Sequence, residues 1–285
     1  VVGATTAETA VVPPNPDRIG KESLLPALDA SATDSDTGDD GRERHALAVG
    51  IIAGDEGIDV FRWRPTSGNL LVVGHRRSGM GVLSDLIAVA ATDVDVALWV
   101  LDTLPQRRRA FRRLPGCRRT APPESAVAVE RFLDDVEAHL ADPDPDTPTV
   151  IVVGDLNRTL VPFDDQAGER MLDRLASLAR PAVDGVDAGV SIVAAGSRHR
   201  EVAPLIAGAA DVLVGDIDDR DRRELGAPAG LEWGDAGARG RCWSTGRERP
   251  VQLADAPDDL ERFIRARLEI REATSDTADG TEAST

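Results

Sequence analysis

The sequence of 285 residues predicts an α/β domain built on a mostly parallel, doubly wound sheet. Continuous apolar runs are typical of strands buried on both faces of a parallel sheet. Segments with the i, i+3, i+4, i+7 spacing of one-sided helices alternate with these runs, which is the order of a doubly wound sheet. The clearest predicted strands are residues 70–73, 96–101, 150–153 and 190–195.

The remaining elements add a β-hairpin before the first long strand and a pair of strands near the end. The hairpin is expected at 47–51 and 58–61, a short strand at 212–214, and the closing pair at 240–244 and 250–253. Helices are expected at 82–90, 104–114, 125–140, 169–178, 219–225 and 258–268. We therefore expect one domain over 45–270, a linker with a disordered acidic insertion at 1–44, and a disordered polar tail at 271–285.

Composition excludes several kinds of partner. The net charge of −17 opposes non-specific attraction to nucleic acid or to an anionic membrane. Cys117 and Cys242 are too few for a disulfide framework or a zinc site, which favours a reducing compartment and a cytoplasmic location. No apolar run has the length of a membrane span. The chain begins with Val1 rather than Met, so we expect it to be part of a longer polypeptide.

Residues 69–90 carry the most informative motif. Strand 70–73 leads into Gly74, and a turn closes at Gly79 before the helix, which together resemble a phosphate-binding loop of the pattern GxxxxGK[ST]. Met80 stands where that pattern has its phosphate-binding lysine, and Gly81 stands where it has the hydroxyl that holds magnesium. The alternative is an ordinary glycine-containing turn. The candidate nucleotide-binding residues of this stretch are Gly74, His75, Arg76, Arg77, Ser78, Gly79, Met80 and Gly81.

The lost lysine has a predictable cost. A charge-assisted hydrogen bond contributes roughly 1.5–3 kcal/mol, so Met80 should weaken nucleotide binding by about ten- to a hundredfold. Arg76 or Arg77 is a candidate replacement cation, and the alternative is that both are solvated loop residues. The loop amides and the helix dipole remain as anion-binding groups.

Asp155 follows the predicted strand at 150–153 and is the candidate acid of a magnesium site. Active ATPases usually place a glutamate after this acid to polarise water, whereas here Leu156 follows. The alternative role for Asp155 is to cap the turn through backbone amides.

A basic cluster follows the strand at 96–101. A nucleic-acid translocase would use such a cluster for phosphate contacts. The alternative, which agrees better with the acidic chain, is a face that pairs with acids of the same or a neighbouring domain. Its members are Arg107, Arg108, Arg109, Arg112, Arg113, Arg118 and Arg119.

The order of the segments NLLVVGHRRSG, VALWVLDTLPQRRRAFRRLPG, TVIVVGDLNRTL, GVSIVAAGSRHR and ARGRCWSTGRERPVQLA resembles the FtsK/SpoIIIE-type ATPase domain. The likeness covers about residues 45–268 and is greatest to degenerate copies in the type VII secretion ATPases called EccC. It implies a RecA-like P-loop NTPase fold. It matches Gly74 and Gly79 to the loop glycines and Asp155 to the acid, and it places Arg198 where active members sense the γ-phosphate.

The resemblance also implies a function. We expect a catalytically degenerate domain, without hydrolysis of its own, that regulates, binds protein or recognises substrate within a type VII (ESX) secretion ATPase. ATP is expected to bind weakly and magnesium to be absent, and no residue is assigned a catalytic role. The partners implied are neighbouring ATPase domains and secreted helical-hairpin proteins, in a membrane-anchored complex. Two alternatives stay open: an active DNA or protein translocase domain completed by a neighbouring subunit, and an unrelated α/β binding domain.

Overall fold

The computed structural model describes residues 46–53, 58–75, 80–144, 146–179, 189–229 and 240–282. The predicted linker and acidic insertion at 1–44 lie outside the described residues, and so do loop residues 76–79.

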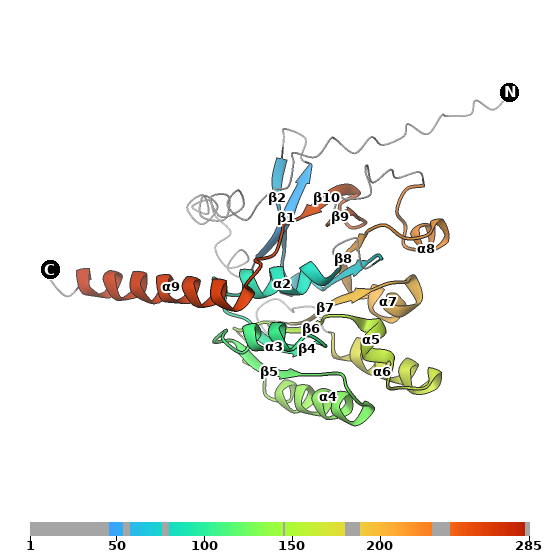
Figure 1. Ribbon diagram of the computed structural model, residues 1–285, viewed down its shortest axis with the longest axis horizontal. Coiled ribbons are helices and arrows are strands. Elements are labelled where there is room, and N and C mark those ends of the chain that lie inside the picture. Colours follow the sequence, from blue (N-terminus) through green and yellow to red (C-terminus); the bar gives the residue numbers. More distant parts are fainter. Residues whose placement is uncertain are drawn as a thin grey trace.

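The described part of the chain forms one sheet of ten strands in the order β2-β1-β10-β9-β8-β3-β7-β6-β4-β5. Figure 1 shows these strands with helices around them. The strands are β1 (Leu47–Ala53), β2 (Ile58–Trp63), β3 (Asn69–Val73), β4 (Ala97–Leu101), β5 (Cys117–Ala121), β6 (Thr149–Val153), β7 (Val190–Gly196), β8 (Ala209–Val214), β9 (Arg241–Ser244) and β10 (Arg249–Leu253).

Strand direction divides the sheet into two parts. The strands from β8 through β3, β7, β6 and β4 to β5 are all parallel to their neighbours. The β1–β2 hairpin and the β9–β10 pair extend it on the β8 side with antiparallel pairing. This confirms the predicted mostly parallel sheet and its added hairpin.

Helices connect the parallel strands and cover the sheet. They are η1 (Pro65–Ser67, a single 3₁₀ turn), α2 (Met80–Ala90), α3 (Pro105–Phe111), α4 (Ala126–Leu140), α5 (Leu156–Leu160), α6 (Asp165–Leu178), α7 (His199–Ile206), α8 (Asp219–Glu224) and α9 (Leu260–Glu282).

Both faces of the sheet are buried. Along β3, Leu70 and Val72 belong to an apolar cluster shared with α2, α3 and α9, while Leu71 and Val73 belong to one shared with α4, α6 and α7. Successive strand residues point to opposite faces of the sheet. Because both faces are covered, every position of this strand from Leu70 to Val73 is apolar. The doubly wound arrangement is therefore confirmed.

Some elements differ from expectation. The sequence did not predict β5, α5 or α7, and the Arg-rich helix is shorter than expected, since α3 ends at Phe111. The last helix continues to Glu282, through residues where a polar tail was expected. In the described part of the chain, no helix combines the length and the apolar character that a membrane crossing requires.

Candidate functional site

Parallel strands bring the predicted site residues to one edge of the sheet. Gly74 follows β3, Asp155 follows β6 by two residues, and Ser197 and Arg198 follow β7. Since β3, β7 and β6 are adjacent and parallel, these residues share the carboxyl edge. In open α/β sheets, ligands bind outside this edge.

Strand β3 is anchored in the middle of the sheet by a buried amide side chain. Asn69 Nδ2 donates to the Leu205 carbonyl at 3.0 Å, and Asn69 Oδ1 accepts from the Ile192 backbone N–H at 2.9 Å. One side chain thus joins the first residue of β3 to β7 and to α7.

The backbone after β3 is held to the strands on either side. The Gly74 N–H donates to the Gly196 carbonyl at 3.1 Å, and the His75 N–H donates to the Asp216 carbonyl at 2.9 Å. The His75 side chain is exposed. Arg76, Arg77, Ser78 and Gly79 lie outside the described residues, so their predicted roles stay predictions.

Asp155 forms the cap of a short helix. Its Oδ1 accepts from the Arg158 N–H at 3.1 Å, its Oδ2 lies 3.6 Å from Arg158 Nε, and its carbonyl accepts from Thr159 Oγ1 at 2.8 Å. These are the contacts of the capping role. The magnesium role stays a prediction.

Arg198 is exposed at the turn between β7 and α7. The turn is fixed by buried Glu201, whose carboxylate accepts from the Ser197 N–H at 2.6 Å and from Ser197 Oγ at 3.0 Å. Across the edge, the pKa of Asp218 is lowered, first by the hydrogen bond from the Asp221 N–H and further by the charges of His75 and Arg198. The charges of His75 and Arg198 are therefore both felt at Asp218, on the same edge of the sheet.

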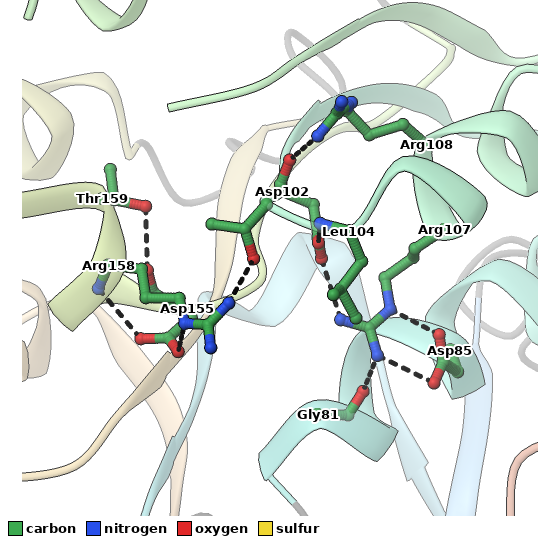
Figure 2. A network of polar contacts seen from close by, with 10 residues as sticks. Gly81, Asp85, Asp102, Leu104, Arg107, Arg108, Asp155, Arg158 and Thr159 are labelled. Carbon is green, nitrogen blue, oxygen red and sulfur yellow. Dashed lines mark hydrogen bonds and ion pairs between the residues drawn. The ribbon is translucent and has the colours of Figure 1, made fainter. Parts of the chain in front are cut away.

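A network of polar contacts near the helix that follows the loop is centred on Arg107 (Figure 2). Its guanidinium donates to both carboxylate oxygens of Asp85, at 2.5 and 2.9 Å, and to Asp102 Oδ2 at 2.9 Å. Nη2 also donates to the Gly81 carbonyl at 2.7 Å, in the first turn of α2. Arg107 therefore ties α3 to the start of α2 and to the end of β4.

The centre of this group is buried, and Asp85 at its edge is half-buried. Arg107 is 8% exposed and Asp102 is 2% exposed. Burial opposes the charge of Arg107, but its hydrogen bond with Asp85 and the negative charges of Asp102 and Asp85 outweigh that effect and raise its pKa. A buried carboxylate needs such a partner, because an unpaired buried charge is strongly destabilising.

The cluster of arginines predicted as one basic face is therefore divided. Arg107 belongs to the interior, which corrects its predicted place on that face. Arg113 pairs with Glu261 of α9 at 2.9 Å, and Arg119 pairs with Asp135 of α4. Arg113 and Arg119 therefore pair with acids of the same chain, which was the alternative to phosphate contacts.

Sequence reasoning missed Asp85 and Asp102 as site residues. Asp102 had a usable signal, because it directly follows an apolar strand, as a metal-binding acid would. Asp85 lies at a helical position with no such signal. Within the described ranges, no group of three or more His, Cys, Asp or Glu side chains has an arrangement that could hold a metal ion.

Comparison with known proteins identifies the fold. No protein-family model matches the sequence, and no curated protein sequence matches it either. Solved structures do match. ATPases 2 and 3 of EssC from Geobacillus thermodenitrificans align over 92% of this chain and 53% of theirs, with a TM-score of 0.64 and 14% identity.

Two further structures extend the comparison. ATPases 2 and 3 of EccC from Thermomonospora curvata, in complex with a signal sequence peptide, align over 83% of this chain and 49% of theirs, with a TM-score of 0.58 and 18% identity. The pCW3 conjugation coupling protein TcpA with ATPγS aligns over 82% of this chain and 73% of its own, with a TM-score of 0.50 and 12% identity.

The chain spans about half the length of the EssC and EccC chains that it matches. At these identities the likeness concerns the fold. The strand that precedes Gly74, the helix that follows the loop and the mostly parallel sheet are all in the order expected from the sequence. The described chain therefore has the P-loop NTPase fold of the ATPase domains of the type VII secretion proteins EssC and EccC.

Proposed function

We propose that this chain is a catalytically degenerate ATPase domain of a type VII secretion ATPase, which binds protein or regulates its neighbours without hydrolysing ATP. We propose further that it binds ATP weakly, binds no magnesium with it, and works in the cytoplasm. The fold supports the ATPase-domain origin. The residues at the loop support the loss of hydrolysis.

One observation carries the proposal. Helix α2 begins at Met80 and has Gly81 in its first turn, directly after the loop that follows β3. These are the positions from which a working domain presents a lysine to the phosphates and a hydroxyl to magnesium. A thioether and a bare backbone supply neither group. Leu156, buried at the start of α5, supplies no base that could orient water.

The proposed partners are neighbouring ATPase domains and a segment of a secreted helical-hairpin protein. The matched EssC and EccC chains contain more than one ATPase domain, and the EccC structure holds a signal sequence peptide. We therefore place its role in recognition or regulation.

Steady-state phosphate release tests the loss of hydrolysis. The wild-type domain with excess ATP and magnesium is expected to release no phosphate above the background without enzyme. The Met80→Lys, Gly81→Ser double variant is measured in parallel, since it restores the two missing groups and shows whether the rest of the site is competent. Turnover of about one per second by the wild type, in the range of ordinary enzymes, would overturn the proposal.

The second candidate is an active translocase domain that a neighbouring subunit completes. Arg112 and Arg118 favour it, because both are exposed in the basic cluster and could meet phosphates. A DNA duplex retained at about 0.15 M salt, with retention lost when both residues become alanine, would select this candidate. The proposed function predicts no retention.

A further inference from the structure

Two residues without side chains frame the Arg107 group. Gly81 lies in the first turn of α2, where a metal-binding hydroxyl belongs. Gly154 is the first residue after β6 and directly precedes Asp155, the candidate acid. The next residue, Asp155, uses its carboxylate to cap α5.

A side chain placed at Gly81 or at Gly154 would point toward the Arg107–Asp102 ion pair. A β-carbon built on Gly154 would come closer to Asp102 Oδ2 than the 3.0 Å that real β-carbons keep, and a β-carbon on Gly81 would lie 3.5 Å from Arg107 Nη2. Asp102 Oδ2 is also the atom that accepts from Arg107 Nη1. The ion pair therefore occupies the space into which side chains at positions 81 and 154 would project.

The oxygens around Arg107 are of the kind that a hard divalent cation uses. Asp85 and Asp102 contribute carboxylates, and Gly81 contributes a carbonyl. A guanidinium satisfies the same oxygens through a planar set of donors and does not lose its charge. Arg108 adds a second positive charge, because its Nη1 donates to the Asp102 carbonyl at 2.6 Å.

We propose that the guanidinium of Arg107 is a built-in cation that replaces the divalent metal of this fold and closes the site to magnesium. The inference rests on the proposed function and supplies its physical cause. A metal ion entering beside Arg107 would meet a fixed positive charge and carboxylates whose oxygens are already bound. The residues present therefore do not fit a magnesium ion.

The same geometry predicts what removal of that charge does. Without the guanidinium, Asp85 and Asp102 are two carboxylates close together with no cation between them. A hard divalent ion is the solute best suited to neutralise them. The test is Arg107→Met, which keeps the length and apolar character of the stem and removes the charge.

Mn²⁺ binding is measured without nucleotide, by electron paramagnetic resonance and by the thermal midpoint with and without the ion. Arg107→Met is expected to bind one Mn²⁺ and to rise in thermal midpoint when the ion is added. The wild type, Arg107→Lys and the control Arg109→Met are expected to bind at least about tenfold more weakly. Arg109 suits the control because it lies on the same helix with its side chain 59% exposed.

Each result decides the proposal. A folded Arg107→Met domain that binds no more Mn²⁺ than the wild type overturns it, and so does tight Mn²⁺ binding by the wild type. If Arg107→Met unfolds, amide spectra of the wild type with ATP and Mn²⁺ decide instead. Signals of Gly81, Asp85 and Asp102 that stay sharp support the proposal, and broadening there overturns it.

This outcome is separable from that of the proposed function. The wild type could release no phosphate while the Arg107→Met variant binds no Mn²⁺. The proposed loss of hydrolysis would then stand, but Arg107 would not be the reason that magnesium is excluded. Turnover in the wild type would remove the proposed function itself, whatever the variant binds.

Discussion

At Gly154 the absence of a side chain leaves room for the carboxylate of Asp102. The residue does not have a positive φ, so its requirement is for space and not for an unusual backbone. Asp102 cannot move aside easily, because Arg107 and the Leu104 N–H both hold it, the latter at 2.7 Å. A single missing β-carbon therefore permits the whole buried ion pair.

Gly154→Ala is expected to lower the free energy of unfolding by about 1–3 kcal/mol, because the new methyl group overlaps Asp102 Oδ2. Urea denaturation measures the change. Gly168→Ala is the matched control: in α6 the added β-carbon would lie 3.4 Å from Leu160 Cδ2 and 3.8 Å from Phe163 Cβ, and alanine favours the helix by about 0.5–1 kcal/mol. Equal effects of the two substitutions would mean that Asp102 does not fill the space beside Gly154.

The arginines illustrate why the site could be predicted only in part. The sequence pointed to Gly74 and Asp155 because each comes just after an apolar strand, and their predicted roles stay predictions. Arg107 carried no signal that separated it from Arg108 or Arg109. Its burial depends on Asp85 and Asp102, which lie 22 and 5 residues away along the chain and meet it only after the strands pair.

At the scale of elements, the sequence predicted long apolar strands well and charged or short elements poorly. Strand β5 was missed because CRRTA has no apolar run, and it forms only as an edge strand beside β4. Helix α7 contains Pro204, which argues against a helix, but its first turn is stabilised from outside by Asp221. The carboxylate of Asp221 accepts from the His199 N–H at 3.2 Å. Tertiary contacts thus override local preference.

Helix α9 differs from expectation in length for a related reason. Residues after 268 lack apolar periodicity, which suggested a tail. Yet Arg267 pairs with Asp93 at 2.9 Å and Arg271 Nη1 donates to the Thr92 carbonyl at 2.9 Å, so polar contacts with the α2–β4 turn hold the helix as far as Arg271. Figure 1 shows α9 extending from the body of the domain toward the C-terminus.

Packing, rather than ion pairing, is expected to hold α9 on the domain. Ile264 is fully buried in the cluster shared with α2 and α3, so Ile264→Ala should lower the free energy of unfolding by about 2–5 kcal/mol. Glu261 pairs with Arg113, whose side chain is 53% exposed, so Glu261→Gln should cost at most about 1 kcal/mol. Urea denaturation compares the two variants. A larger loss for Glu261→Gln would show that the charged contacts dominate.

At the scale of the whole molecule, the described chain has the P-loop NTPase fold. The sheet order, the strand before Gly74 and the helix after the loop are those of the fold shared with EssC and EccC. The replacements that we propose are local and involve Met80, Gly81 and Arg107. The fold could be predicted because it depends on many apolar positions, whereas the state of the site depends on a few contacts between distant residues.

We propose that the site keeps its architecture while the Arg107 guanidinium stands in for the metal. The decisive measurement is a titration of a fluorescent ATP analogue, with and without magnesium. Weak binding is expected, with an affinity that changes by less than about threefold when magnesium is added. Binding that magnesium tightens by about tenfold or more would mean that the metal enters beside Arg107 and would overturn the proposal.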